Sequence, residues 1–306
     1  MKLDNWFAPA WRVGCALVIL VGLGGVVFAF AQDAPEFRIT NDLTYRTING
    51  VELKLDVMEP AQGEGPFPVV ICIHGGAWRG GKRQDMKPFM ERFVRRGYVA
   101  VSPSYRLCPD HVFPAQVFDL KAVVRWIKTN APTYKIDPER VGAFGVSAGA
   151  HLAMMLGTAG PENGLEIEPE EELPANAPST KIHAVVNVVG PTDLRAKNIP
   201  PVSRPLLRDF LGGEPDELTI PAALASPVAL LTKDDAPILT FQGTRDPLVP
   251  YDQAVLLADK MHEVGVAGRV ELLVGEGHGW GEPELSRTLE QSLAFFDRYL
   301  KPSRRK

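Results

Sequence analysis

The sequence predicts an α/β fold in which a mostly parallel central sheet carries helices on both faces. Six short apolar runs are typical of parallel strands that are covered on both sides. These runs are PVVICIHG, GYVAVSP, RVGAFGV, HAVVNVVG, APILTFQG and RVELLVGEG. Between them lie segments with apolar residues three and four positions apart, as in 117–127 and 289–300, which is a helical spacing. The alternation of strand and helix predicts a doubly wound sheet.

One earlier segment has a different periodicity. Val51, Leu53, Leu55 and Val57 alternate with residues that are mostly polar. A period of two predicts a strand with one face turned to solvent. We therefore expect an antiparallel strand at the edge of the sheet, paired with residues 43–47.

Length and charge narrow the classes of function. The 306 residues suffice for one large domain, expected over 32–306, with a small cap at 195–235. A formal net charge of −4 argues against a nucleic-acid-binding protein, which needs a basic surface to neutralise phosphates. The cysteines lack the spaced partners of a zinc site, and we expect no metal and no organic cofactor. Nothing in the sequence indicates an oligomeric state.

The N-terminus resembles an export signal. Residues 13–31 are apolar and uncharged, they follow Lys2 and Arg12, and they end in Ala29-Phe30-Ala31, the small-residue pattern before a signal peptidase site. We expect residues 1–31 to be a signal peptide and the mature protein to be secreted or periplasmic. The alternative is a retained membrane anchor, because the apolar run is close to the length that spans a bilayer.

The segment 161–181 is rich in acidic residues and proline. Such a composition favours a solvated loop. The alternative is a rim of the substrate cleft, because function concentrates on long irregular loops.

The strongest functional signal is Gly145-Val146-Ser147-Ala148-Gly149, which fits the pattern G-x-S-x-G. It follows the apolar run RVGAF and precedes the helix-like AGAHLAMML. A serine in such a strand-to-helix turn is held above the end of the sheet, and its small neighbours avoid collisions with nearby backbone. We therefore predict that Ser147 is a nucleophile.

A serine nucleophile needs a base, and the base needs a carboxylate that orients it. His278 follows the last apolar run, so it should lie at the carboxyl edge of the sheet, where Ser147 also emerges. Asp246 follows the penultimate run, which places the acid between serine and histidine in chain order. Asp193 also follows a strand, and its alternative role is a helix N-cap. We predict Ser147, Asp246 and His278 as the catalytic residues.

The sequence also contains candidates for an oxyanion hole. His74-Gly75-Gly76-Ala77-Trp78 ends the first central strand, and small residues there let backbone N–H groups of Gly75, Gly76 and Ala77 approach a substrate oxygen. The N–H of Ala148, directly after the nucleophile, would complete the hole.

Two tryptophans are candidates for substrate binding. Trp78 either lines the cleft or packs beneath it. Trp280 lies two residues after His278 in GEGHGW.

The motifs HGGAW, GVSAGAH, GPTDL, FQGTRDPLVP and GEGHGW, in this order and spacing, resemble the α/β-hydrolase carboxylesterases of the HGGxW type. The likeness is greatest to the acetylesterase and feruloyl-esterase-like branch and extends over residues 42–300. It implies the α/β-hydrolase fold, the same three catalytic residues, and main-chain donors at Gly76, Ala77 and Ala148. Gln242 departs from the family's pattern, because relatives usually have histidine at this strand end, and the departure implies no evident catalytic penalty.

The residues and the resemblance together imply a serine carboxylic-ester hydrolase that forms an acyl-enzyme. Its expected substrates are short-chain acyl esters, with acetyl or feruloyl groups on plant polysaccharide or small sugar esters. One alternative is a serine peptidase of the prolyl-oligopeptidase type, although no repeated propeller pattern is present. The other is a non-catalytic binding protein with a hydrolase fold.

Overall fold

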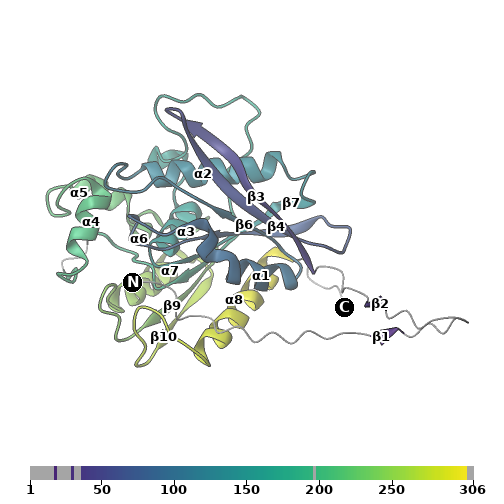
Figure 1. The fold of residues 1–306 in the computed structure, drawn as a ribbon. Helices are drawn as coiled ribbons and strands as arrows, with labels where there is room; N and C mark the ends of the chain where they lie inside the picture. Colours follow the sequence, from purple (N-terminus) through teal and green to yellow (C-terminus); the bar gives the residue numbers. More distant parts are fainter. Residues whose placement is uncertain (1–16, 19–28, 31–35, 196–197, 302–306) are drawn as a thin grey trace, which may run out of the picture.

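The computed structural model describes residues 17–18, 29–30, 36–195 and 198–301. Its centre is an eight-stranded sheet (Figure 1). The strands of this sheet are β3 (Phe37–Ile48), β4 (Val51–Pro60), β5 (Phe67–Ile73), β6 (Val99–Pro103), β7 (Ile136–Val146), β8 (Ala184–Val188), β9 (Ile238–Gly243) and β10 (Gly268–Leu273). Their order across the sheet is β10-β9-β8-β7-β5-β6-β4-β3.

The six apolar runs of the sequence form β5 to β10, and these strands are mutually parallel. Chain order and spatial order differ, since β7 lies beside β5 and not beside β6. The sheet therefore reverses its winding direction next to β5, and the carboxyl ends of the strands on both sides of this point face the same crevice. The predicted doubly wound arrangement is confirmed.

The alternating segment at 51–57 lies in β4, which pairs antiparallel with β3 over the predicted region. The prediction that it is an edge strand is wrong. β4 also pairs antiparallel with β6, so that β3 forms the edge. The alternation arises because Leu53, Leu55 and Val57 are buried, whereas Val51 lies exposed at the start of the strand.

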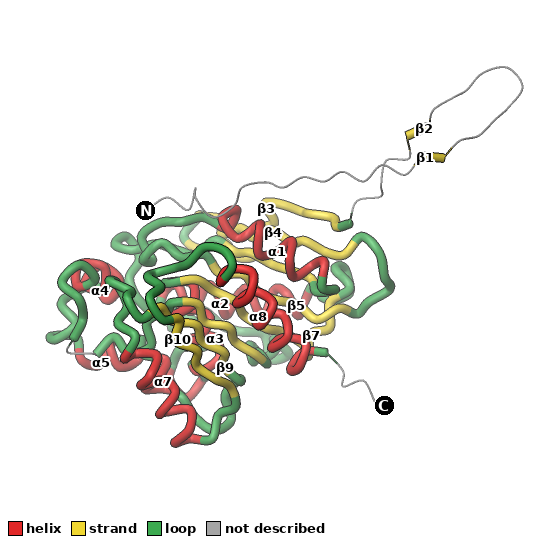
Figure 2. Tube along the Cα trace, turned by 90° about the horizontal axis from the view of Figure 1, so that it is seen from below, coloured by secondary structure: helices red, strands yellow, loops and turns green. Residues whose placement is uncertain are grey.

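Five longer helices cover both faces of the sheet, as Figures 1 and 2 show. They are α1 (Lys87–Arg95), α2 (Ala115–Thr129), α3 (Ala148–Thr158), α7 (Asp252–Val264) and α8 (Glu284–Leu300). Buried side chains of α2, α3 and α7 belong to one hydrophobic cluster, and those of α1 and α8 belong to a second cluster. Successive residues of β9 alternate between the clusters, with Ile238 in the first and Leu239 in the second, as the pleat of a strand requires.

Shorter helices occupy the segment where the sequence suggested a cap. They are α4 (Arg204–Leu211), α5 (Thr219–Leu224) and α6 (Pro227–Leu230). Trp78 stacks on Phe210 of α4 with ring centroids 4.3 Å apart, and Arg79 lies 3.3 Å from Asp209. The helix α4 is thus held against the loop that follows β5.

The acidic segment 161–181 lies against α2 and is joined to it by ion pairs, such as Arg125–Glu166 at 3.1 Å. None of its residues lines the cavity described below. The alternative that this segment forms a rim of the cleft is therefore wrong, and most of its residues are exposed or half-buried, as expected for a solvated loop.

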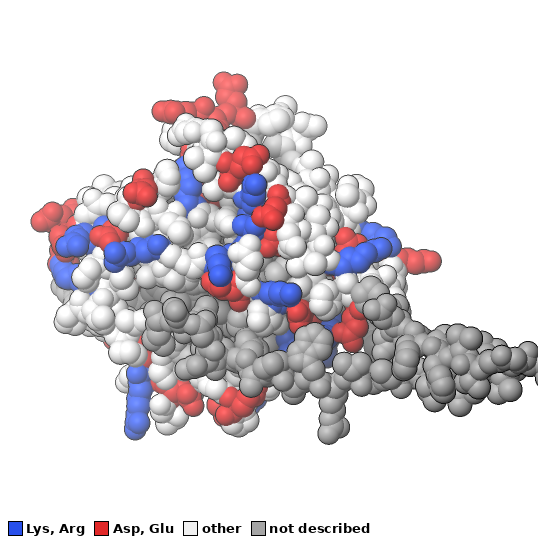
Figure 3. Space-filling view, viewed as in Figure 1, with Lys and Arg blue, Asp and Glu red and all other residues white. Residues whose placement is uncertain are grey.

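The predicted export signal lies outside the described residues apart from β1 (Leu17–Val18) and β2 (Ala29–Phe30), which pair antiparallel. The signal peptide stays a prediction. Among the helices that the structure describes, none combines the length and the hydropathy needed to cross a bilayer. On the face shown in Figure 3, basic and acidic side chains are interspersed among neutral residues.

Candidate active site

Ser147 lies at the turn between β7 and α3. Its backbone has φ 56° and ψ −123°, a left-handed conformation that is strained for a residue with a side chain. Its N–H donates to the carbonyl of Val188 on the neighbouring strand, at 2.8 Å. A Cβ on Gly145 would collide with the carbonyl oxygen of Gly149, and a Cβ on Gly149 would collide with the carbonyls that end β5. The flanking glycines are required because backbone segments approach closely on both sides of the turn.

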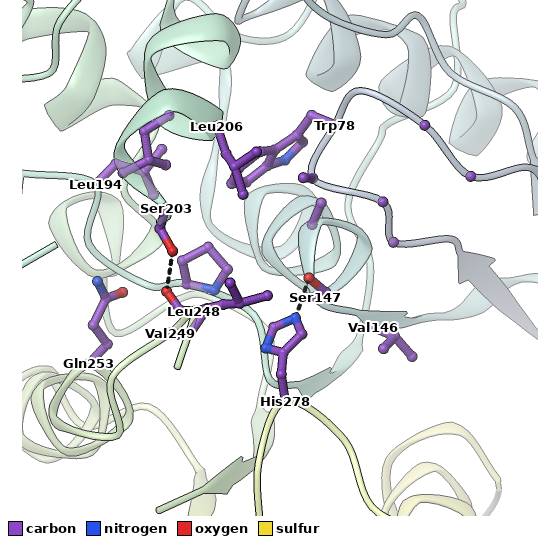
Figure 4. A pocket seen from close by; sticks show the side chains of 18 of the residues that line it. Trp78, Val146, Ser147, Leu194, Ser203, Leu206, Leu248, Val249, Gln253 and His278 are labelled. Atoms are coloured by element: carbon purple, nitrogen blue, oxygen red, sulfur yellow. Dashed lines mark hydrogen bonds between the residues drawn. The ribbon is translucent and has the colours of Figure 1, made fainter. Parts of the chain in front are cut away.

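His278 reaches Ser147 from the loop after β10. Its Nε2 lies 2.8 Å from Ser147 Oγ, and its Nδ1 lies 2.7 Å from Asp246 Oδ2. Because the aspartate oxygen can only accept, Nδ1 carries the proton and Nε2 accepts from the serine hydroxyl. Figure 4 shows the imidazole facing Ser147 at the floor of a cavity. We call these three hydrogen-bonded residues the Ser147 triad.

Asp246 is the buried end of the triad. The N–H groups of Leu248 and Val249 donate to its Oδ1 at 2.8 and 3.0 Å, and Nε2 of Gln242 donates to its Oδ2 at 2.9 Å. Burial by itself would raise the pKa of the carboxyl, but the hydrogen bond and charge of His278 and the two N–H groups outweigh it and hold the pKa below the usual range. Asp246 is therefore ionised at neutral pH.

Asp193, the other candidate acid, lines the cavity described below, but its carboxylate does not join the triad. Its carboxylate accepts from the backbone and side chain of Arg195 at 2.8 to 2.9 Å. Asp193 lies in a turn, so it does not have the alternative role of a helix N-cap either.

A cavity of about 810 Å³ lies in front of Ser147 and His278. The four predicted oxyanion-hole residues, Gly75, Gly76, Ala77 and Ala148, all line it. Apolar side chains form much of the remaining wall, and Figure 4 shows several of them to one side of Ser147. They include Leu194, Ile199, Leu206, Leu207, Leu248 and Val249.

Backbone N–H groups at the cavity are available to a ligand. Within residues 36–195 and 198–301, no acceptor contacts the N–H groups of Gly76, Ala77 or Ala148. Ala77 and Trp78 have φ of 53° and 57°, so two consecutive residues with side chains adopt the left-handed conformation. This backbone geometry is costly, and such strain is commonly found at functional sites.

Trp78 both lines the cavity and packs into its wall. Its indole N–H donates to Nδ1 of His151 at 3.2 Å, and Nε2 of His151 donates to the carbonyl of Ala225 at 2.8 Å. Burial lowers the pKa of His151 to about 4, so its imidazole is neutral. His151 thus connects the loop after β5 with the segment after α5.

Comparisons with known proteins identify the family of the chain. The model of the BD-FAE family matches residues 55–261, which is most of the chain. The protein belongs to the BD-FAE family. Its resemblance to α/β-hydrolase carboxylesterases of the HGGxW type is confirmed.

Individual relatives of this BD-FAE protein are named as esterases. It is 30% identical over 231 residues to Esterase LipC of Mycobacterium tuberculosis, covering 73% of this chain and 55% of LipC. The chain thus spans about half the length of the curated relatives that it matches.

Solved structures of similar proteins match most of the chain. The propionate-bound Est2 esterase of Thermogutta terrifontis has a TM-score of 0.71 at 25% identity, covering 88% of this chain and 97% of Est2. A truncated carbohydrate esterase from gut microbiota has a TM-score of 0.73 at 25% identity, covering 85% of this chain and 95% of that esterase.

The prediction for Trp280 fails in this BD-FAE protein. Its side chain is 5% exposed in the core beneath α8, and its indole N–H donates to Thr288 Oγ1 at 3.0 Å. It does not line the cavity with Ser147. A buried indole usually finds an acceptor for its N–H, and Thr288 supplies that acceptor here.

Sequence reasoning also missed residues at the site. Gln242 contacts Asp246, and its position four residues before the acid, at the end of β9, was the available signal. The leucines of α4 were missed because their distance from Ser147 in the sequence conceals their place in the cavity wall. In the part of the chain that the structure describes, no group of three or more His, Cys, Asp or Glu side chains could hold a metal ion.

Proposed function

We propose that the protein is a serine carboxylic-ester hydrolase that works through an acyl-enzyme. The observation that carries the proposal is the Ser147 triad, with 2.8 Å between Ser147 and His278 and 2.7 Å between His278 and Asp246, at the floor of a cavity. A neutral imidazole that accepts from a serine hydroxyl and donates to an ionised carboxylate is the arrangement that activates serine.

In the first half of the reaction Ser147 Oγ attacks the carbonyl carbon of the ester. The serine proton passes to His278 Nε2, and Asp246 stabilises the imidazolium that results. The intermediate then expels the alcohol, which takes the proton from Nε2. The products of this half are the free alcohol and an acyl group bonded to Ser147 Oγ.

The negative oxygen of the tetrahedral intermediate needs donors that are already in place. The N–H groups of Gly76, Ala77 and Ala148, which have no acceptor among the described residues, supply them. One such donor typically contributes about 3 kcal/mol to stabilisation of the transition state.

The second half repeats the chemistry with water. His278 Nε2 takes a proton from a water molecule, the resulting hydroxide attacks the acyl carbon, and the bond to Ser147 Oγ breaks. The proton returns to the serine, and the carboxylic acid leaves.

We propose short-chain acyl esters as substrates, with acetyl or feruloyl groups on plant polysaccharide or small sugar esters. Two relatives support this class by their names: Est2, which has been solved with propionate and with butyrate bound, and the carbohydrate esterase from gut microbiota. The apolar wall suits a hydrocarbon or aromatic acyl group, and about 810 Å³ exceeds what an acetyl group fills, which leaves space for the alcohol.

The test compares wild type with Ser147→Ala on p-nitrophenyl acetate, p-nitrophenyl decanoate, methyl ferulate and acetylated xylan. We expect kcat to fall by roughly 10⁶-fold with little change in thermal unfolding, because the hydroxyl is part of the reaction and not of the core. The matched control is Ser102→Ala, at a buried serine on β6 that does not line the cavity. Undiminished turnover by Ser147→Ala would refute the mechanism. Wild type inert to all four esters and unlabelled by a fluorophosphonate would instead support a binding protein.

A further inference from the structure

We propose that Gln242 is a positioning residue that locks the Asp246 carboxylate in the orientation that His278 requires. The inference goes beyond the proposed function and rests on it for its kinetic consequences. Gln242 does not line the cavity, so it acts on the reaction through Asp246, which it contacts.

Gln242 stands at the end of β9 and is 1% exposed. Its Nε2 donates to Asp246 Oδ2 at 2.9 Å and to the carbonyl of Val249 at 2.9 Å. Both neighbours are acceptors, and this determines which end of the amide is the NH₂ group. Because the N–H of Val249 itself donates to Asp246 Oδ1, Gln242 ties together the start and the end of the acid loop, residues 246–249.

The carboxylate of Asp246 has about four acceptor positions, and four donors occupy them. Leu248 and Val249 donate to Oδ1, while Gln242 and His278 donate to Oδ2. Rotation of the carboxylate about its Cβ–Cγ bond would break all four hydrogen bonds. Without Gln242, Oδ2 keeps only the bond to His278, and rotation costs less.

The charge of these donors matters as much as their number. Gln242, Leu248 and Val249 are neutral donors, so His278 is the one titratable group in contact with the Asp246 carboxylate among the described residues. The full negative charge of Asp246 is therefore directed at the imidazolium that forms during the reaction. A lysine or arginine in place of Gln242 would hold the carboxylate but compete for its charge.

The other charged side chains that line the cavity with His278 are Lys82, Asp85 and Asp193. On its own loop, Glu276 accepts from the backbone N–H of Arg245 through its main-chain carbonyl, and the Arg245 side chain extends into solvent. From the other packed elements, Asp246 and Ser147 contact the imidazole. A change at Gln242 thus reaches His278 through Asp246.

The first experiment is Gln242→Leu, which keeps the size of the side chain and removes both donors. We expect kcat for p-nitrophenyl acetate to fall tenfold to a hundredfold while KM stays within twofold, because the residue lies outside the cavity and a small misplacement of a catalytic group is costly. The matched control is Thr240→Val, two residues earlier on β9. It removes a buried hydrogen bond to Asn187 at 3.2 Å without touching the triad, and its kcat should stay within twofold of wild type.

The second experiment is Gln242→Glu, which preserves size and polarity and keeps the proposal testable where the leucine variant does not fold. A second carboxylate beside Asp246 favours the protonated imidazole, so the acid limb of the kcat/KM profile should move up by about one pH unit. The acid limb of Thr240→Val should not move.

A readout independent of turnover is the low-field proton NMR resonance of His278 Nδ1–H. Its titration midpoint should rise in Gln242→Glu, and the resonance should weaken in Gln242→Leu. An acid limb and a titration midpoint that do not move in Gln242→Glu, together with a resonance that does not weaken in Gln242→Leu, would overturn the positioning role. A loss of kcat in Thr240→Val equal to that in Gln242→Leu would also overturn it. If the wild type hydrolyses no ester, the proposed function fails, and the NMR titration still decides whether Gln242 holds the Asp246–His278 pair.

Discussion

At the scale of single residues, the absence of a Cβ atom at Gly149 allows the start of α3 to contact the end of β5. A Cβ on Gly149 would lie 2.5 Å from the carbonyl oxygen of His74 and even closer to that of Ile73. The start of α3 can therefore rest directly on the end of β5. This contact brings the N–H of Ala148 and those of Gly76 and Ala77 to the same cavity.

We predict that Gly149→Ala destabilises the fold by about 1–3 kcal/mol, the usual cost of overpacking, and lowers kcat because the loop after β5 must move. Urea unfolding and kinetics on p-nitrophenyl acetate measure the two effects. The control is Gly281→Ala, where an added Cβ meets no atom within 4 Å, and its stability should stay within about 0.5 kcal/mol of wild type. Equal stability of the two variants would contradict the close-approach explanation.

At the scale of elements, α3 is the centre of the site. It begins directly after Ser147, it is buried along almost its whole length, and it carries His151 one turn later. Through His151 the helix holds Trp78 on one side and the carbonyl of Ala225 on the other. A buried neutral histidine in this place links helix α3, the loop after β5 and the segment after α5.

The buried histidine should make stability depend on pH. Burial lowers the pKa of His151 to about 4, against about 6.5 in an unfolded chain. Between these values the unfolded chain binds a proton that the folded protein does not, so stability falls as pH falls from 6.5 to 4, by about 3 kcal/mol in total. In His151→Gln, whose amide can still donate to Ala225, this contribution disappears. Urea unfolding of both proteins at pH 4.5 and pH 7 gives the comparison, and equal differences would exclude His151 as the source.

At the scale of the whole molecule, a buried ion network joins the edge of the sheet to the acidic segment. Asp119 of α2 accepts from Arg46 of β3 at 2.6 Å and from Arg106 at 2.9 Å. Arg46 continues to Glu171 at 2.7 Å, and Arg106 pairs with Glu168. The acidic residues of 161–181 therefore supply counter-charges to the buried Arg46 and Arg106, whose two positive charges Asp119 alone does not balance.

Asp119→Asn should lower the free energy of unfolding by about 3–5 kcal/mol, because it leaves two buried guanidinium groups short of a counter-charge. Asp234→Asn is the matched control, since Asp234 pairs with Lys233 on the exposed surface and its loss should leave stability almost unchanged. Urea unfolding of both variants measures this. A small effect of Asp119→Asn would mean that water or other groups compensate the arginines.

Most of the fold follows from local pattern, because apolar runs of strand length and helical spacing each depend on residues close in sequence. Ser147, Asp246 and His278 were predictable for the same reason, since each follows the end of a parallel strand and such ends share one edge of the sheet. The position of Trp280 beneath α8, the contact of Gln242 with Asp246 and the leucines of α4 in the cavity wall were not predictable. They depend on which of several nearby partners a side chain contacts.

The sequence by itself determined the doubly wound sheet and which residues emerge at its carboxyl edge, because periodicity and glycine placement act locally. Only the tertiary structure decided that β3 and not β4 closes the sheet, that segment 161–181 lies on α2, and that Gln242 holds Asp246. These outcomes depend on the packing of segments distant in the sequence, where burial of charge and saturation of hydrogen bonds select one arrangement among several that the local pattern allows.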